Sequence, residues 1–449
     1  MAKIVVCIDG TGNEVGNRET NVLKLYRALD KKKHKARYFM GVGTYDGPQI
    51  FGRIRQAVTG FLGQTFGLGL EDDVLGAYRY ICETYQSRED KQASRGDGNY
   101  ANDQIYIVGF SRGAYAARIL AGFIHNFGLV DANHMHLVAP VFRAYRRVTD
   151  FEKTTNDDKV FQSLREYERV IRPKTAPIRA LMLFDTVNSL IRFRRPWYNL
   201  RTYGSLAEIG THASVNSNVS VRIVTHALAI DERRTMFRAQ HWTPERDDDG
   251  TPVYYGNNFR HASSKRLQYV TQRWFPGFHS DIGGSPAEDE SGIGKLTLLW
   301  MLDQLAADER AADAEDNAAR KKAGKPALPT PRTYGLKLNT REANKILKGL
   351  DEDARTPGGL PYAKPDPLAP IHDSFWHSKV APVWHVLEIL IKSIKRREKG
   401  PPKWYRRGFI WYLPLKEPRF IADKANVHPS AYTRRDTPLA NYDPPNLPR

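Results

Sequence analysis

The stretch QIYIVGFSRGA at residues 104–114 decides the fold that this sequence predicts. Its apolar run at 105–108 predicts a buried strand, and the alanine-rich pattern that starts at its end predicts a helix. Between the two lies Gly109-Phe110-Ser111-Arg112-Gly113, which matches the G-x-S-x-G turn that presents a nucleophilic serine. Such a turn strains the serine backbone, so Gly109 and Gly113 keep its neighbours small. We therefore expect the Ser111 hydroxyl to project from a sheet edge at a helix N-terminus, where backbone N–H groups favour negative charge.

Apolar runs and amphipathic segments alternate on both sides of this stretch. The sequence predicts strands at 3–8, 36–40, 104–108, 178–184, 221–229 and 268–275, and helices at 21–29, 70–85, 114–123, 138–171 (two helices) and 292–307. The polar residues 86–102 predict a surface loop. Strands that alternate with helices indicate an α/β fold with a mostly parallel sheet flanked by helices. Ligand sites in such sheets lie at the carboxyl ends of the strands.

Composition limits the class of protein. The 449 residues include 68 Lys and Arg against 50 Asp and Glu, a formal net charge of +18, and 41% are hydrophobic, which excludes a mostly disordered or fibrous chain. Two cysteines, Cys7 and Cys82, exclude a disulfide framework and fit a reducing compartment. No apolar run approaches the roughly 18 residues of a membrane span, and the N-terminus lacks the pattern of a signal peptide. We therefore expect a protein that is cytoplasmic as synthesised, with any export through a signal-independent secretion system.

The sequence predicts two regions. Residues 1–310 hold the predicted strands and form the expected catalytic domain, in which the glycine-rich residues 41–69 are expected to be a lid or substrate loop. Residues 311–449 are proline-rich and basic, and residues 391–449 alone carry 14 Lys or Arg and 5 Asp or Glu, a net charge of +9. Two placements stay open for this irregular C-terminal region. It packs on the core, or its basic residues, mixed with Trp and Tyr, contact an anionic membrane surface.

A serine nucleophile needs a base, and the base needs a carboxylate that orients it. In α/β-hydrolases the three follow in the order serine, acid, histidine. Asp185 closes the apolar strand at 178–184 and would face the same sheet edge as Ser111. His279 lies in a glycine-flanked loop after the strand at 268–275, where such a base belongs. The sequence therefore predicts Ser111, Asp185 and His279 as nucleophile, acid and base.

Three residues have competing interpretations. His428 is the main rival of His279 for the role of base. Asp281 is a rival acid, although a loop aspartate so close to the base more often fixes the turn or holds a metal. Asp9 closes the first strand, as the nucleophile does in haloacid-dehalogenase-type phosphatases, but Thr11 stands where those enzymes need a second aspartate. The alternative for Asp9 is a turn residue that bonds local N–H groups.

The proposed chemistry also needs hydrogen-bond donors for the oxyanion that develops on the attacked carbonyl. One expected donor is the backbone N–H of Arg112, the residue after the nucleophile. The other is expected from Gly10 or Thr11, in the turn after the first strand, where glycines let the backbone approach a ligand. The reaction needs neither a cofactor nor a metal ion.

Several motifs together resemble a known family. They are Asp9-Gly10-Thr11-Gly12-Asn13, Gly109-Phe110-Ser111-Arg112-Gly113-Ala114, Phe184-Asp185-Thr186-Val187, Ala229-Ile230-Asp231-Glu232-Arg233-Arg234, the run WFPGFHSDIGG at 274–284, and Val427-His428-Pro429-Ser430 with Arg434-Arg435. This set resembles the α/β-hydrolase domain of uncharacterised function that includes the class 1 type VI secretion phospholipase effectors. The resemblance implies an α/β-hydrolase fold, the same three catalytic residues, and hydrolysis of glycerophospholipid acyl esters. It also implies partners: a lipid substrate, a secretion apparatus and an immunity protein.

The expected function is therefore that of a serine hydrolase that cleaves acyl esters, as a phospholipase or lipase. Two alternatives stay open. The first is a non-lipid esterase or an acyltransferase of the same fold. The second is a basic interaction or nucleic-acid-binding protein on an inactive hydrolase scaffold, although no nucleic-acid-binding motif accompanies the positive charge.

Overall fold

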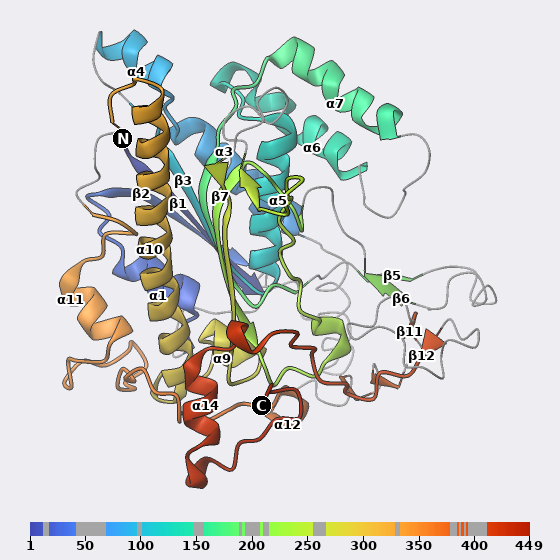
Figure 1. The fold of residues 1–449 in the computed structure, drawn as a ribbon, viewed down its shortest axis with the longest axis vertical. Helices are drawn as coiled ribbons and strands as arrows, with labels where there is room; N and C mark the ends of the chain where they lie inside the picture. The colour runs from blue at the N-terminus through green and yellow to red at the C-terminus, as the bar shows by residue number, and fades with distance from the viewer. Residues whose placement is uncertain are drawn as a thin grey trace, which may run out of the picture.

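The structure is a computed structural model of the chain (Figure 1). It describes residues 1–11, 18–41, 69–96, 101–147, 157–187, 191–193, 207–209, 215–254, 266–327, 333–377, 384–385, 388–389, 392–393 and 411–449. The lid or substrate loop predicted at 41–69 lies outside the described residues, apart from its two ends.

Six parallel strands form the central sheet, in the order β10-β7-β4-β3-β1-β2. They are β1 (Lys3–Thr11), β2 (His34–Gly41), β3 (Gln104–Phe110), β4 (Ile178–Phe184), β7 (Val221–Ala229) and β10 (Tyr269–Phe275). All six were predicted from apolar runs, and the mostly parallel sheet is confirmed. The strand order places the carboxyl ends of β3, β4, β7 and β10 next to one another along one edge.

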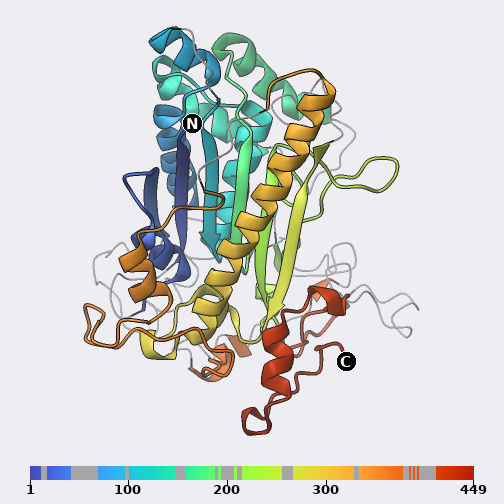
Figure 2. The ribbon, with the colours of Figure 1, turned by 60° about the vertical axis from the view of Figure 1, so that its left-hand side comes forward.

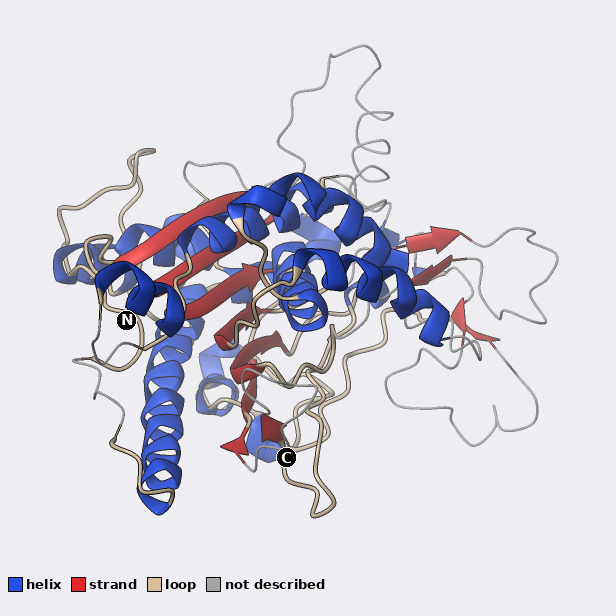
Figure 3. Cartoon of the chain, turned by 90° about the horizontal axis from the view of Figure 1, so that it is seen from above, coloured by secondary structure: helices blue, strands red, loops and turns tan. Residues whose placement is uncertain are grey.

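Helices cover both faces of this sheet (Figures 1 and 3). One face carries α3 (Leu70–Thr84), α5 (Arg112–Phe127), α6 (Val138–Arg147) and α7 (Asp157–Ile171), and the other carries α1 (Asn21–Ala28) and α10 (Gly292–Lys322). Alternate residues of β1 serve the two layers: Ile4 and Val6 pack with α3 and α5, whereas Val5 and Cys7 pack with α1 and α10. A strand buried on both faces is apolar throughout, which explains why its sequence is a continuous apolar run.

The loop predicted at 86–102 is wrong in part, because helix α4 (Arg88–Arg95) lies within it. Ser87 caps this helix: its hydroxyl accepts a hydrogen bond from the Asp90 N–H (3.1 Å), and the Asp90 carboxylate accepts one from the Ser87 N–H (2.9 Å). This reciprocal capping box stabilises the first turn. The segment has few apolar residues, so it carries no helical hydrophobic periodicity that the sequence pattern could reveal.

Short elements complete the description. They are the strand pairs β5 (Ile191–Phe193) with β6 (Ala207–Ile209), β8 (Val253–Tyr254) with β9 (Arg266–Leu267) and β11 (Lys392–Ser393) with β12 (Trp411–Tyr412); the helices α9 (His279–Gly283), α11 (Thr340–Glu342), α12 (Ser374–His377) and α14 (Pro429–Arg435); and the turns η1 (Ala132–Leu137), η3 (Thr235–Phe237), η4 (Glu288–Glu290), η5 (Ala343–Leu347), η8 (Lys424–Asn426) and η9 (Pro438–Ala440). Among the described residues, no helix is both long and apolar enough to cross a membrane.

The C-terminal segment, residues 411–449, lies against the carboxyl ends of β7 and β10 (Figure 2). Its side chains Ile421, Val427 and Leu447 form a small buried core with Leu228 and Trp274 of those strands. The His428 N–H also donates to the Trp274 carbonyl oxygen (2.8 Å). The last part of the chain is therefore packed beside the sheet edge where a ligand site is expected.

Helix α10 runs without a break through residue 310, where the sequence predicts the boundary between two regions. In the basic C-terminal region, helical spacing of four apolar residues favours membrane contact: Trp384, Leu387, Ile391 and Ile394. Only Trp384 lies among the described residues. Its ring is buried and packs edge-on against Phe237 (5.2 Å between centroids). The division into 1–310 and 311–449 remains a proposal.

Candidate active site

Ser111 occupies the tight turn between β3 and α5. Its backbone has φ 58° and ψ −122°, in the region that non-glycine residues rarely adopt. The turn has no room for larger neighbours, because a Cβ added at Gly109 would lie 2.6 Å from the Gly113 carbonyl oxygen. The Ser111 N–H donates to the Phe184 carbonyl oxygen at the end of β4 (3.0 Å), which fixes the turn against the neighbouring strand.

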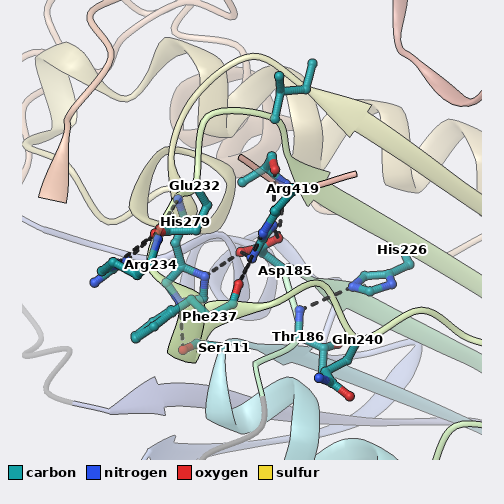
Figure 4. Close-up of polar contacts among 12 residues, drawn as sticks. Ser111, Asp185, Thr186, His226, Glu232, Arg234, Phe237, Gln240, His279 and Arg419 are labelled. Carbon is teal, nitrogen blue, oxygen red and sulfur yellow. Dashed lines mark hydrogen bonds and ion pairs between the residues drawn. The ribbon is translucent and has the colours of Figure 1, made fainter. Parts of the chain in front are cut away.

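The structure brings Ser111, His279 and Asp185 together in one chain of hydrogen bonds (Figure 4). The Ser111 Oγ lies 2.7 Å from His279 Nε2, and His279 Nδ1 lies 2.6 Å from Asp185 Oδ2. The three residues come from the ends of β3, β4 and β10, at the carboxyl edge of the sheet. Asp185 also has a positive φ, 39°, so two of the three residues hold strained backbones.

Burial and charge set the protonation of this group. Burial lowers the pKa of His279, and the hydrogen bond that its Nδ1–H donates to Asp185 offsets this only in part. The imidazole is therefore neutral near pH 7, with Nδ1–H donating to Asp185 and Nε2 able to accept a proton. Burial by itself would raise the pKa of Asp185, but the Arg419 charge and the bond to His279 outweigh it and hold that pKa well below its usual range. Asp185 is therefore ionised.

Arg419 is a residue of this site that the sequence did not indicate. Its guanidinium forms two bonds to Asp185, Nη1 to Oδ1 (2.6 Å) and Nη2 to Oδ2 (3.0 Å), and its side chain is 3% exposed. It stands in an irregular stretch of the C-terminal segment, with no motif around it. A single arginine in a basic region carries no local signal that would single it out.

A second ion pair lies beside His279. The Glu232 carboxylate receives bonds from Arg234 Nε (2.8 Å) and Nη2 (2.7 Å), and it also accepts the His279 N–H (3.4 Å). The Arg234 guanidinium lies 3.8 Å from the ring centroid of Phe237. Both Glu232 and Arg234 belong to a motif that carried the family resemblance, although no role was predicted for either of them.

Aromatic rings enclose the imidazole. The ring centroids of Phe110 and Phe237 each lie 4.9 Å from that of His279, Phe237 in an edge-on arrangement. Phe110 is the residue before the nucleophile, so the elbow itself supplies one wall. Apolar neighbours disfavour the charged imidazolium, which agrees with the lowered pKa of His279.

The rival residues have other partners. Asp281 Oδ2 accepts the Phe278 N–H (2.8 Å), and its Oδ1 lies 2.7 Å from His372 Nδ1, so it fixes the turn that carries His279. His428 caps helix α14, where its Nδ1 accepts the Ser430 N–H (3.2 Å), and its ring stacks on Phe275. Neither residue joins the hydrogen-bond chain of the site.

His226 stands in β7, whose sequence is an apolar run, and it contacts Thr186, the residue after Asp185 (Figure 4). Its Nε2 accepts the Thr186 N–H (3.2 Å), and its Nδ1 lies 3.3 Å from Gln272 Oε1. Burial, with the charge of Arg118 as a smaller cause, lowers the pKa of His226 well below its usual value. A neutral imidazole therefore holds the backbone next to Asp185 in place.

The predicted oxyanion donors lie where β1 meets α5. Arg112 is the first residue of α5. The backbone N–H groups of a helix's first turn point out of its N-terminus, which is the positive end of the helix dipole. The Gly10 N–H donates to Asp9 Oδ1 (2.6 Å), and Asp9 Oδ2 accepts bonds from the hydroxyls of Thr20 (2.5 Å) and Tyr38 (2.7 Å). Asp9 lies within β1, and only the Gly10 N–H is a local donor, because the two hydroxyls come from α1's cap and from β2. Only the backbone of Thr11 is described.

The described residues contain no group of three or more His, Cys, Asp or Glu that could hold a metal ion. Fold and site define a class: an α/β protein with a serine, a neutral histidine and an ionised aspartate in hydrogen-bond contact at the carboxyl edge of a parallel sheet. Within this class the chain belongs to the family described as the T6SS phospholipase effector Tle1-like catalytic domain, whose model matches residues 2–304, about two thirds of the chain.

Individual relatives match this chain at low sequence identity and over part of its length. The uncharacterized protein YEL023C of Saccharomyces cerevisiae is 27% identical over 252 residues, which cover 54% of this chain and 33% of that protein. The chain thus spans about a third of the length of this relative. Among solved structures, an uncharacterized protein from Pseudomonas aeruginosa matches with a TM-score of 0.32 and 16% identity, over 69% of this chain and 46% of that one. The Tle1 effector bound to the VgrG spike of the type VI secretion system matches with a TM-score of 0.28 and 17% identity, over 65% and 53%.

Proposed function

We propose that this protein is a serine hydrolase that cleaves acyl esters of lipids, with Ser111 as nucleophile, His279 as base and Asp185 as acid. The observation that carries the proposal is the continuous chain from Ser111 Oγ to His279 Nε2 (2.7 Å) and from His279 Nδ1 to Asp185 Oδ2 (2.6 Å). A hydroxyl in contact with a neutral, oriented imidazole is the arrangement that activates a serine.

In the proposed first half of the reaction, Ser111 Oγ attacks the ester carbonyl carbon while His279 Nε2 takes the hydroxyl proton. Asp185 holds the imidazole by Nδ1 and stabilises the imidazolium. The tetrahedral intermediate then collapses: the bond to the alcohol oxygen breaks, the imidazolium gives its proton to that oxygen, and an acyl-serine remains. In the second half, His279 takes a proton from water, the resulting hydroxide attacks the acyl-serine, and the fatty acid leaves as the proton returns to Ser111.

We propose the N–H of Arg112 and the N–H of Thr11 as the donors that receive the oxyanion. Arg112 follows the nucleophile at the start of α5, where the helix dipole favours negative charge. The two candidates are the last residues of β1, and Gly10 already donates to Asp9 Oδ1, so Thr11 is the better choice. The residues Asp9, Gly109 and Gly113 support the turn, and Asp281 supports the loop of His279.

A lipid substrate is supported first by the family, whose description names phospholipase effectors. It is supported second by exposed apolar side chains of the C-terminal region: Trp376 is 73% exposed, Ile389 61% and Leu415 65%. The Leu415 N–H donates to the Glu388 carbonyl oxygen (3.2 Å), so Leu415 lies beside Ile389. The Lys416 ammonium lies 5.7 Å from the Trp376 ring. Exposed apolar residues next to a cation suit the interface of an anionic membrane.

This apolar surface is linked to the site through two contacts. The Glu388 carboxylate accepts the Thr235 N–H (2.7 Å), and Thr235 begins the turn η3 that ends at Phe237. The Phe237 ring in turn packs against His279. We therefore propose that the basic C-terminal region contacts the membrane from which the substrate is drawn. Export by a type VI secretion apparatus, and a neutralising immunity protein, are proposed from the family alone.

Labelling with a fluorophosphonate tests the reaction class. The purified chain is expected to form a covalent adduct at Ser111, identified by mass spectrometry. The substitution Ser111→Ala should abolish both the adduct and ester hydrolysis, a loss of several orders of magnitude. The matched control is Ser94→Ala, an exposed serine on α4, which should label like the wild type. Folded wild-type protein that does not label would contradict the enzyme and favour an inactive scaffold.

The assignment of the base and of the substrate can be tested with the same preparation. His279→Ala should abolish labelling, whereas His428→Ala should retain it, because His428 lies outside the hydrogen-bond chain. Hydrolysis of phospholipid vesicles is then compared with that of short-chain nitrophenyl esters, and the products are identified by lipid mass spectrometry. Turnover of the short esters without any release of fatty acid from vesicles would favour a non-lipid esterase.

A further inference from the structure

We propose that Arg419 is a positioning residue for this reaction: its guanidinium holds the Asp185 carboxylate in the orientation that receives His279. The inference rests on the proposed function. Under this proposal, a residue of the C-terminal segment supports the reaction, although it lies outside residues 2–304, which the family model matches.

The geometry around Asp185 leaves its carboxylate one orientation. Oδ1 accepts bonds from Arg419 Nη1 (2.6 Å) and the Ala229 N–H (3.0 Å), and Oδ2 accepts bonds from Arg419 Nη2 (3.0 Å) and His279 Nδ1 (2.6 Å). Each oxygen therefore has two donors, and rotation of the carboxylate would break all four bonds. The planar fork of arginine matches a carboxylate in this bidentate way, which a lysine ammonium does not do.

Arg419 is itself held in place by the elements around the site. Its Nη1 also donates to the Ala229 carbonyl oxygen (3.1 Å), and its Nε donates to the Phe237 carbonyl oxygen (3.1 Å). The Asn446 side chain ties the segment down, with bonds to the Arg419 carbonyl oxygen (3.0 Å) and the Ile230 carbonyl oxygen (2.9 Å). Arg419 thus joins Asp185 to the turn of Phe237, whose ring contacts His279.

The charge of Arg419 also matters, because Asp185 is fully buried. Within the described part of the chain, other charged or titratable groups also face the pair of Asp185 and His279. They are Glu232 and Arg234 after β7, Ser111 at α5, His226 in β7, His241 after η3, and Arg118 of α5. The Arg118 guanidinium lies 3.4 Å from His226 Nδ1. None of these bonds to Asp185 as Arg419 does: Arg234 is paired with Glu232, and burial keeps His226 and His241 neutral. Without Arg419, the buried carboxyl would take up a proton more readily.

The experiment measures the rate of fluorophosphonate labelling of Ser111 as a function of pH for the wild type, Arg419→Met and Arg419→Lys. Arg419→Met should slow labelling at neutral pH on the order of a hundredfold, because misplacing a catalytic group by about 1 Å has an effect of that size. Its acid limb, which reports proton uptake by the coupled pair of Asp185 and His279, should move up by about one pH unit or more, because losing a neighbouring positive charge favours that uptake and such a charge shifts a pKa by roughly 1–3 units. Arg419→Lys keeps the charge but not the planar fork, so its labelling rate should lie between those of the wild type and Arg419→Met.

The matched control is Arg434→Met. Arg434 is also a buried arginine of the C-terminal segment, and its Nη1 donates to the carbonyl oxygens of Pro367 and Ala369 (2.8 Å each), away from Asp185. This variant should lose stability in a thermal melt yet keep the wild-type acid limb. Addition of methylguanidinium should restore part of the rate of Arg419→Met and leave Arg434→Met unchanged.

An acid limb in Arg419→Met that coincides with that of the wild type would overturn the positioning role, even if the rate of this variant is lower. If Arg419→Met does not fold, Arg419→Lys decides the question by its labelling rate at neutral pH: because lysine lacks the fork, a rate equal to that of the wild type would overturn the role. Failure of the proposed function is a different result, since then the wild type itself would not label at Ser111.

Discussion

Gly113, in the first turn of α5, lies directly against the backbone of Asp9 at the end of β1: a Cβ at position 113 would stand 2.3 Å from the Asp9 carbonyl oxygen. Real Cβ atoms do not come so close, and the neighbour is backbone, which cannot swing aside. Gly113→Ala should therefore push α5 and β1 apart, lower stability by about 1–3 kcal/mol as other overpacked sites do, and displace Ser111. Denaturant unfolding and the labelling rate of Ser111 measure the two effects.

A suitable comparison for this substitution is Gly359→Ala. Gly359 has φ 85°, and a Cβ at this position would have no heavy atom within 4 Å, so alanine there meets only backbone strain. It should lose a little stability and keep full labelling. Equal loss of labelling in both variants would show that the close approach of Gly113 to Asp9 is not what positions Ser111.

The pH dependence of the reaction follows from the burial of His279. Burial lowers its pKa below the ordinary 6.5, so the imidazole stays unprotonated, and able to act as a base, to lower pH than a free histidine. Activity should therefore be constant near neutrality and fall only as the pH drops through this lowered value. The acid limb of kcat/KM, measured with a soluble ester, is expected below pH 6.5. A midpoint at or above this ordinary value would argue against such an environment.

The sequence predicted the inner strands β3, β4 and β7 well because they are buried on both faces. The apolar runs at 178–184 and 221–229 coincide with β4 and β7 in both bounds. A strand covered by two helical layers is apolar at every position, so it stands out without any knowledge of its neighbours. Helix α4 lacks such a pattern and was missed, although its capping residues Ser87 and Asp90 were visible.

The candidate site was only partly predictable for a physical reason. Ser111, Asp185 and His279 each follow a predicted strand, and the topology of a parallel sheet brings strand ends together. Arg419 follows no strand and lies 234 positions from Asp185 in the chain. An ion pair between such distant segments depends on where the tail packs, and no spacing rule encodes that packing. Local sequence patterns identify site residues that follow the strands of the sheet, but not residues that reach the site because the C-terminal segment packs there.

The ion pair between Asp185 and Arg419 should be visible in stability as well as in activity. Asp185→Asn should reduce kcat on the order of 10⁴-fold, because the amide cannot hold the imidazole as the carboxylate does. It should also destabilise the fold by roughly 3–5 kcal/mol, because a buried guanidinium loses its counter-charge. Adding Arg419→Met to Asp185→Asn should recover part of that loss in urea unfolding. A double variant less stable than Asp185→Asn would show that Arg419 stabilises the fold mainly through other contacts.

Another buried carboxylate, outside the hydrogen-bond chain of the site, gives an independent prediction. Glu288 pairs with Lys24 (2.9 Å) and with Lys295, and none of the three is more than 1% exposed in its side chain. Glu288→Gln should lower the free energy of unfolding by an amount near the lower end of the range of roughly 3–5 kcal/mol that breaking a buried ion pair costs. The loss is limited because burial already lowers the pKa of Lys295 to about 8, so this lysine can release its proton once Glu288 is neutral.

The control for Glu288 is Glu352→Gln. Glu352 pairs with Lys364 at the surface, where the two side chains are 82% and 62% exposed, so water screens the pair. Its loss should leave the midpoint of thermal unfolding unchanged. If both substitutions shift the midpoint equally, the buried cluster of Glu288 contributes no more to stability than the exposed pair of Glu352 and Lys364.

The position of Arg419 after Ser111, Asp185 and His279 in the sequence bears on when the newly made protein can become active. A ribosome delivers Ser111, Asp185 and His279 long before it delivers Arg419, and the Asn446 anchor comes later still. Under the proposed role of Arg419, a nascent polypeptide that has reached His279 holds all three reactive side chains and still lacks a working arrangement of them. Synthesis itself would then delay esterase activity until the segment that carries Arg419 and Asn446 has left the ribosome.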